Sequence, residues 1–222
     1  MKSGDWTWLE VTKIGLGVLT PLTLVCISFL IDNSLRSGEA ARQREKAILE
    51  FSEDIYARRV RAELLASGLR RHAQDPSEQS MSEVIDRKTA YDAAYADWNR
   101  RNQSNLLIIR RVLAAEVYTN LEATIEFFLV GRGFAPLDAC LTNAYDEAIR
   151  GRDPQGVMDN CDVRSLLSYV LNCGYALTDE LYTASARGSE LRSISAFFSG
   201  QIFDHCDLPS IGGRFRGFSE PN

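Results

Sequence analysis

The stretch KIGLGVLTPLTLVCISFLID, residues 13–32, contains eighteen consecutive residues without a formal charge, between Lys13 and Asp32. At about 1.5 Å per residue, a helix of this run is about 27 Å long, close to the roughly 30 Å of a bilayer's hydrocarbon core. Its apolar side chains fall on all sides of the helix, whereas a surface helix of a soluble protein keeps a polar face. We therefore expect residues 14–31 to form a transmembrane helix.

The residues around this run agree with a membrane span. Trp6 and Trp8 precede it at a depth suited to the headgroup region, and with Lys13 they are candidate membrane-interface anchors. Pro21 removes one helical hydrogen bond, which bilayer-spanning helices tolerate when threonine hydroxyls lie nearby. A cleaved signal peptide and a buried helix of a soluble core are the alternatives. The acidic residues before the run disfavour the signal peptide.

The charges that flank the run bear on its orientation. Lys2 and Lys13 precede it, whereas Arg36, Arg42, Arg44 and Lys46 follow it closely. Basic residues are retained on the cytoplasmic side of a membrane. We expect a single-pass protein, in a bacterial inner membrane, with its helical domain in the cytoplasm. The cysteines give weaker support to the opposite orientation.

The composition indicates one folded domain behind the anchor. The chain has 222 residues, of which 45% are hydrophobic and 25% are charged, and it has a net charge of -5. Acidic residues prevail in its C-terminal half, and nucleic-acid binding needs a dense basic cluster, so we exclude a nucleic-acid partner. We expect an interfacial segment (1–13), the span (14–31), a helical bundle domain (32–206) and a loosely ordered tail (207–222).

Apolar residues at helical spacing predict the helices of the bundle. A long helix should run from Ser34 to Gln74 as a stalk that continues the span, with an apolar face made of Ile48, Phe51, Ile55, Tyr56, Val60 and Leu64. Further helices are expected after the polar break at residues 73–80, over 106–130 up to Gly131 and Gly133, and from Pro136 to Ala148. After a loop at 151–156, two more should follow at 163–186 and 190–203. Tyr175 belongs to the apolar set of the 163–186 helix.

The helix after residue 80 has the most regular pattern. Val84, Lys88, Tyr91, Tyr95 and Trp98 follow alternating spacings of four and three, and the continuation meets Asn102 and Asn105. A helix end or register break near residues 100–105 is the interpretation we favour. The alternative is a continuous helix in which Trp98, Asn102 and Asn105 are polar packing or pocket residues. No strand pattern persists, so the predicted fold is an all-α, antiparallel helical bundle on a transmembrane helix.

Four cysteines lie outside the span, at Cys140, Cys161, Cys173 and Cys206. In an oxidising compartment they could form two disulfides, with three possible pairings. In a reducing one they would be buried thiols that pack as small hydrophobic groups. Their spacings lack a two-residue pair, which argues against zinc.

The sequence offers no catalytic constellation. His72 and His205 are its two histidines, and neither lies in a catalytic motif. The nucleotide-binding, hydrolase and metalloprotease signatures are missing, so we predict no cofactor and no metal, and favour a protein that is not an enzyme.

We expect a membrane-anchored module that works through protein–protein interaction, as a subunit, scaffold or sensor. Its partners would be the lipid bilayer and another protein or a second copy of itself. One alternative is a membrane-active effector that self-associates through its span, for which the small residues of the run are the support. A second alternative is an enzyme whose site is assembled from scattered residues.

Overall fold

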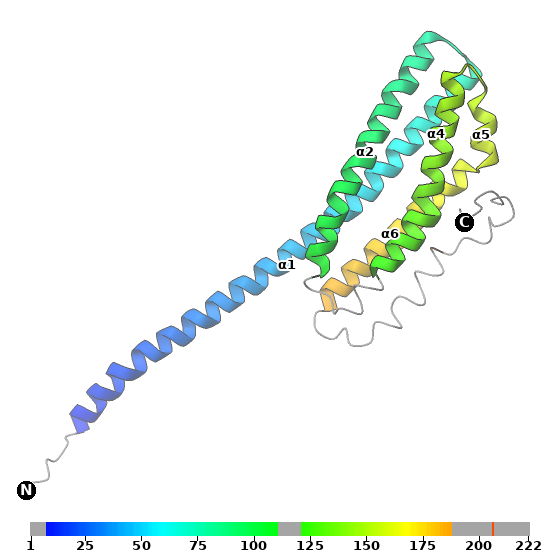
Figure 1. The fold of residues 1–222 in the computed structure, drawn as a ribbon. Coiled ribbons are helices and arrows are strands. Elements are labelled where there is room, and N and C mark those ends of the chain that lie inside the picture. Colours follow the sequence, from blue (N-terminus) through cyan, green and yellow to red (C-terminus); the bar gives the residue numbers. More distant parts are fainter. Residues whose placement is uncertain (1–7, 111–120, 188–205, 207–222) are drawn as a thin grey trace, which may run out of the picture. The chain divides into compact units, whose positions relative to one another are not determined.

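The computed structural model describes the backbone of residues 8–110, 121–187 and 206, and the side chains of residues 28, 38, 39, 41–110, 121–183 and 206. Every element in these ranges is a helix (Figure 1). The elements are α1 (Trp8–Gln74), α2 (Glu78–Arg110), the π-helix η1 (Ile125–Phe134), α4 (Ala135–Ile149), α5 (Pro154–Asn160) and α6 (Val163–Arg187). The prediction of an all-α fold is confirmed.

The chain divides into two compact units, Met1–Gln43 and Arg44–Asn222. In the first unit, the structure describes the N-terminal part of α1, which contains the predicted span. Within the part of the chain that the structure describes, no helix combines the length and the apolar character that a bilayer crossing requires. The side chains of residues 14–31 lie outside the described set, apart from Ser28. The transmembrane helix therefore stays a prediction.

Within the second unit, α1 and α2 pack as an antiparallel pair. Ring centroids of Phe51 and Trp98 lie 5.6 Å apart. Farther along α1, the Arg71 guanidinium lies 3.0 Å from Glu83 near the start of α2. Residues later in α1 therefore contact residues earlier in α2, as in an antiparallel pair. The short break of Asp75 to Ser77 between the helices matches the predicted polar turn.

Helices α4 and α6 complete the bundle around this pair. Helix α4 contacts η1, α5, α6 and α2, and α6 contacts η1. A side-chain contact also joins the end of η1 to α2, because the rings of Trp98 and Phe134 lie 5.5 Å apart. On the other side, Gly174 of α6 packs against Ile55 of α1. One core is shared by all these helices.

The predicted helix stop at Gly131 and Gly133 is wrong. The chain continues as η1 through both glycines and enters α4 directly at Ala135. Gly133 is buried, and a Cβ atom there would lie 3.0 Å from Val170 Cγ2 and 3.1 Å from Tyr169 Cε1. This glycine therefore permits close packing of η1 on α6. Pro136 stands at the start of α4, as predicted.

The predicted loop at 151–156 is also only partly right. Gly151 takes a positive φ of 68° that suits glycine. Asp153 then caps α5, since its carboxylate accepts hydrogen bonds from the backbone N–H groups of Gln155 and Gly156. The short helix α5 thus begins inside the predicted loop. The predicted helix 190–203 and the predicted tail 207–222 lie outside the described residues.

Two predicted apolar faces need correction. Val60 and Leu64 of α1 are exposed, and so is Tyr175 of α6. The buried face of α1 instead follows one unbroken series with spacings of three and four residues, namely Ile48, Phe51, Ile55, Arg58, Ala62, Leu65 and Leu69. The series includes Arg58, so a search for apolar residues alone follows it only as far as Ile55.

Candidate functional site

A half-open groove lies between α1 and α2 on the surface of the second unit. Its volume is about 360 Å³, and we call it the α1–α2 groove. It is lined by four alanines and four charged residues, namely Ala57, Ala90, Ala93, Ala94, Asp54, Arg61, Asp97 and Arg101. The alanine side chains are short, so another backbone could come close to both helices.

Asp54 is the most deeply placed charged residue of the groove. Its side chain is 9% exposed, and Oδ1 lies 3.4 Å from Arg101 Nη1. The second oxygen, Oδ2, is buried and makes no hydrogen bond within the described part of the chain. Burial raises the pKa of Asp54 above its ordinary value, and the nearby carboxylates of Asp97, Glu50 and Glu53 act in the same direction, while Arg101 opposes them. The groove therefore contains an acceptor whose charge is incompletely compensated.

A second polar cluster lies in the interior and joins α1, α2 and α4. The Arg58 guanidinium donates to Asp138 Oδ2, and the Tyr91 hydroxyl donates to Asp138 Oδ1. The Arg58 side chain is only 2% exposed. Its guanidinium also lies over the rings of Phe134, at 4.0 Å, and Tyr95, at 4.7 Å. We call Arg58, Tyr91 and Asp138 the Arg58 cluster.

The electrostatics of the Arg58 cluster suit a packing role. Burial raises the pKa of Asp138, although Arg58 and the Tyr91 hydroxyl lower it. Burial, together with the neighbouring Asp138 charge, raises the pKa of Tyr91, so this phenol stays protonated and can donate. Arg58 and Asp138 pair between α1 and α4, while Arg58 Nε is buried without a hydrogen bond to any described residue. The cluster therefore links α1, α2 and α4 through side-chain contacts.

The predicted polar residues of α2 lie in the core. Helix α2 runs through Asn102 and Asn105 without a break, so the helix end favoured from the sequence is wrong. Asn102 is 7% exposed and Asn105 is 3% exposed. Asn102 Oδ1 and Asn105 Nδ2 are buried without a hydrogen bond to any described residue. Trp98, one helical turn earlier, is buried between Phe51 and Phe134.

The remaining predicted residues divide into two groups. The structure pairs Cys140 with Cys161 and Cys173 with Cys206, which selects one of the three pairings. The interface anchors Trp6, Trp8 and Lys13 have side chains outside the described residues. Within the described ranges, no group of three or more His, Cys, Asp or Glu is arranged to hold a metal ion.

Sequence reasoning missed both Asp54 and Arg58. For Arg58 a signal exists, because the three-and-four spacing from Ile48 through Phe51 and Ile55 leads directly to it. Asp54 has no such signal, since it lies in a charged stretch of α1 with other acids. Its burial depends on how α2 covers it. No family model, curated protein or solved structure matches this chain.

Proposed function

We propose that the chain is a single-pass membrane protein whose helical bundle works by binding a protein partner, and that a helix of this partner docks in the α1–α2 groove. The anchor is proposed from the charge-free run at residues 14–31. The docking site is proposed from the groove and its charges. The partner's class follows from the chemistry of the groove's floor and of its buried acceptor.

The observation that carries the proposal is the carboxylate of Asp54 at the alanine floor. Oδ2 is buried without a partner among the described residues, and burial of such a group is costly unless something donates to it. A lysine or arginine of an incoming helix would compensate the charge of this carboxylate through the part of the Asp54 side chain that stays exposed. The exposed alanines Ala57 and Ala93 would let the two backbones approach. A partner helix with a basic residue among small residues fits this surface.

Site-specific photocrosslinking in intact membranes tests the proposal. A photoreactive amino acid is placed at Ala57 or Ala93 in the groove, and at Ala96 as a control. Ala96 is an exposed alanine of α2 that does not line the groove. We expect Ala57 and Ala93 to yield an adduct with the same helical segment of one protein, with a basic residue near the linked position. Ala96 should yield none.

Substitutions in the groove give the second arm of the test. Asp54→Asn should abolish the adducts, because it removes the charge that the partner's basic residue needs. Asp92→Asn is the matched control, since Asp92 is an exposed acid of α2 outside the groove that pairs with Lys88. Equal adducts at Ala96, or adducts that survive Asp54→Asn, would refute the docking site. A linked peptide from this same chain would instead identify a second copy as the occupant.

A further inference from the structure

The two disulfides bear on the compartment in which the bundle works. Each joins a pair whose Cα atoms lie at distances typical of disulfides, 6.1 Å for Cys140 and Cys161 and 4.7 Å for Cys173 and Cys206. All four cysteines outside the predicted span are used. Cytosolic thiols are kept reduced, and disulfides persist in oxidising compartments.

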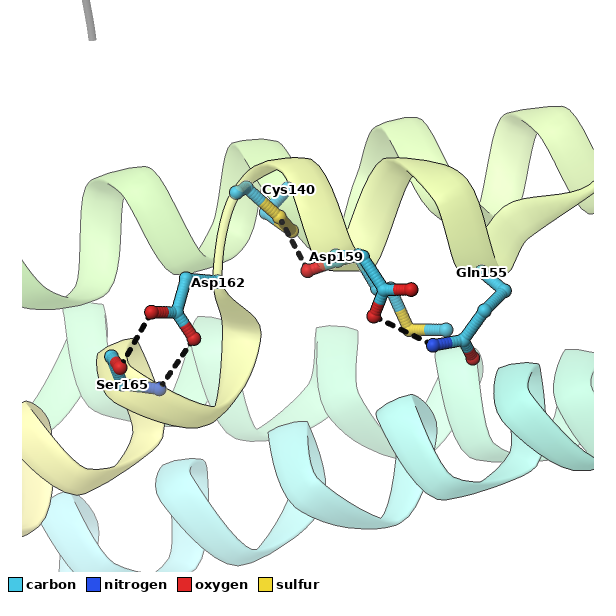
Figure 2. Close-up of a disulfide and its surroundings, with 7 residues drawn as sticks. Cys140, Gln155, Asp159, Asp162 and Ser165 are labelled. Atoms are coloured by element: carbon cyan, nitrogen blue, oxygen red, sulfur yellow. Dashed lines mark hydrogen bonds between the residues drawn. A yellow bond between two sulfur atoms is a disulfide. The ribbon is translucent and has the colours of Figure 1, made fainter. Parts of the chain in front are cut away.

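The first disulfide ties α4 to the end of α5. Cys140, which Figure 2 labels beside the disulfide, lies in α4. Cys161 is the residue that ends α5. Helix α5 has seven residues, too few to be stable by itself, and it packs on α4. The Asp153 cap and the packing of α5 on α4 support this placement independently of the sulfur atoms. The packing of the helices therefore places Cys140 next to Cys161.

The second disulfide ties α6 to Cys206. Cys173 and Cys206 are both fully buried. The Tyr169 hydroxyl lies 2.9 Å from the Cys206 carbonyl oxygen and 3.0 Å from that of Phe128. This tyrosine is another group that holds the Cys206 backbone against α6 and η1. Zinc is the other common reason for cysteines to meet, and the described residues offer no cluster for it.

From these contacts we infer that the bundle matures and works on the oxidising side of the membrane, with both disulfides formed. Each disulfide forms when two thiols lose two protons and two electrons to a disulfide of a thiol oxidoreductase, which becomes a dithiol. The inference reverses the orientation expected from Arg36, Arg42, Arg44 and Lys46. It rests on the proposed anchor for its sidedness. The partner of the α1–α2 groove would then be an extracytoplasmic protein or domain.

Counting free thiols in the full chain tests this inference. Membranes are quenched with acid, denatured and treated with a maleimide polymer, with or without prior reduction. The chain has five cysteines, of which Cys26 lies in the span and is left unpaired by the two disulfides. We expect one adduct without reduction and five after it, and none and four in a Cys26→Ser variant. Five adducts without reduction would overturn the inference.

Two further measurements assign the pairs and the side of the membrane. Cys140→Ser should free Cys161 and add one adduct, whereas Cys140→Ser with Cys161→Ser should add none. In sealed right-side-out vesicles, an added protease should digest the bundle, and in inverted vesicles it should not. Protection in right-side-out vesicles would refute the orientation. The thiol count does not depend on any partner, so it separates failure of this inference from failure of the docking site.

Discussion

Removing the Arg58 guanidinium should destabilise the bundle strongly. Arg58→Met keeps most of the side-chain volume but leaves Asp138 as a largely buried carboxylate with only the Tyr91 hydroxyl as partner. Removing one partner of a buried ion pair costs about 3–5 kcal/mol. Each kilocalorie lowers the melting temperature of a domain of this size by about 2–4 °C. We therefore expect melting about 6–20 °C lower at neutral pH.

A double substitution separates the ion pair from general packing. Replacing both charges, as in Arg58→Met with Asp138→Leu, leaves no uncompensated charge, and such replacements are often neutral. The double variant should therefore melt well above Arg58→Met alone. Thermal unfolding of the full chain in detergent, followed by circular dichroism, measures both. If Arg58→Met melts like the wild type, or if the double variant is as unstable as the single one, the cluster does not have the role assigned to it.

The same cluster predicts a pH dependence for Arg58→Met. Without Arg58, the pKa of Asp138 should rise further above its unfolded value, because the two contributions of Arg58 that lower it are gone. A carboxyl whose folded pKa is raised binds more protons when folded, so stability falls as pH rises above the unfolded pKa of about 3.9. The deficit of Arg58→Met should therefore shrink as the pH is lowered towards 4. If Arg58→Met loses as much stability near pH 4 as at neutral pH, this explanation is contradicted.

Four other variants test separate parts of the structure. Asp54→Asn should not lower the melting temperature at neutral pH, and a clear loss of stability there would contradict this. Because burial raises the pKa of Asp54, the substitution should also weaken the fall of stability above pH 4. Gly174→Ala should destabilise the bundle by about 1–3 kcal/mol, because its Cβ would lie 2.7 Å from Ile55 Cγ2. Gly38→Ala is the control, because a Cβ there would have no atom within 4 Å, and it should be neutral or stabilising by up to about 1 kcal/mol. Replacing both cysteines of the α6 disulfide with serine should cost about 4 kcal/mol, given its separation of 33 residues, measured by the same melting experiment.

The sequence predicts the helices well because their apolar spacing depends on the helix itself. The α1 end at Gln74 and the start of α6 at Val163 fall where the pattern placed them. The continuation of the helix through Gly133 could not be predicted from the sequence. Glycine is needed there because a Cβ atom would come too close to Tyr169 of α6. That contact joins residues far apart in the chain, and local propensity contains no information about it.

The candidate site was less predictable than the helices. Arg58, Asn102 and Asn105 all occupy heptad-like positions, so spacing places them on the inner faces of α1 and α2. Their polar side chains predict exposure to solvent at the same positions. Whether such a residue is buried depends on whether another helix supplies a partner for it. Asp138 supplies one for Arg58. Asp54 lies outside this series, and it is buried beside Arg101 of α2.

The apolar segment at residues 14–31 is proposed to anchor a folded helical bundle to a membrane. Washing membranes that contain the full chain with alkaline carbonate tests this anchor, since the wash removes peripheral proteins and leaves those that span the bilayer. We predict that the full chain stays in the sedimented membranes, and that a chain without residues 1–33 does not. Release of the full, unprocessed chain into the supernatant would contradict the claim.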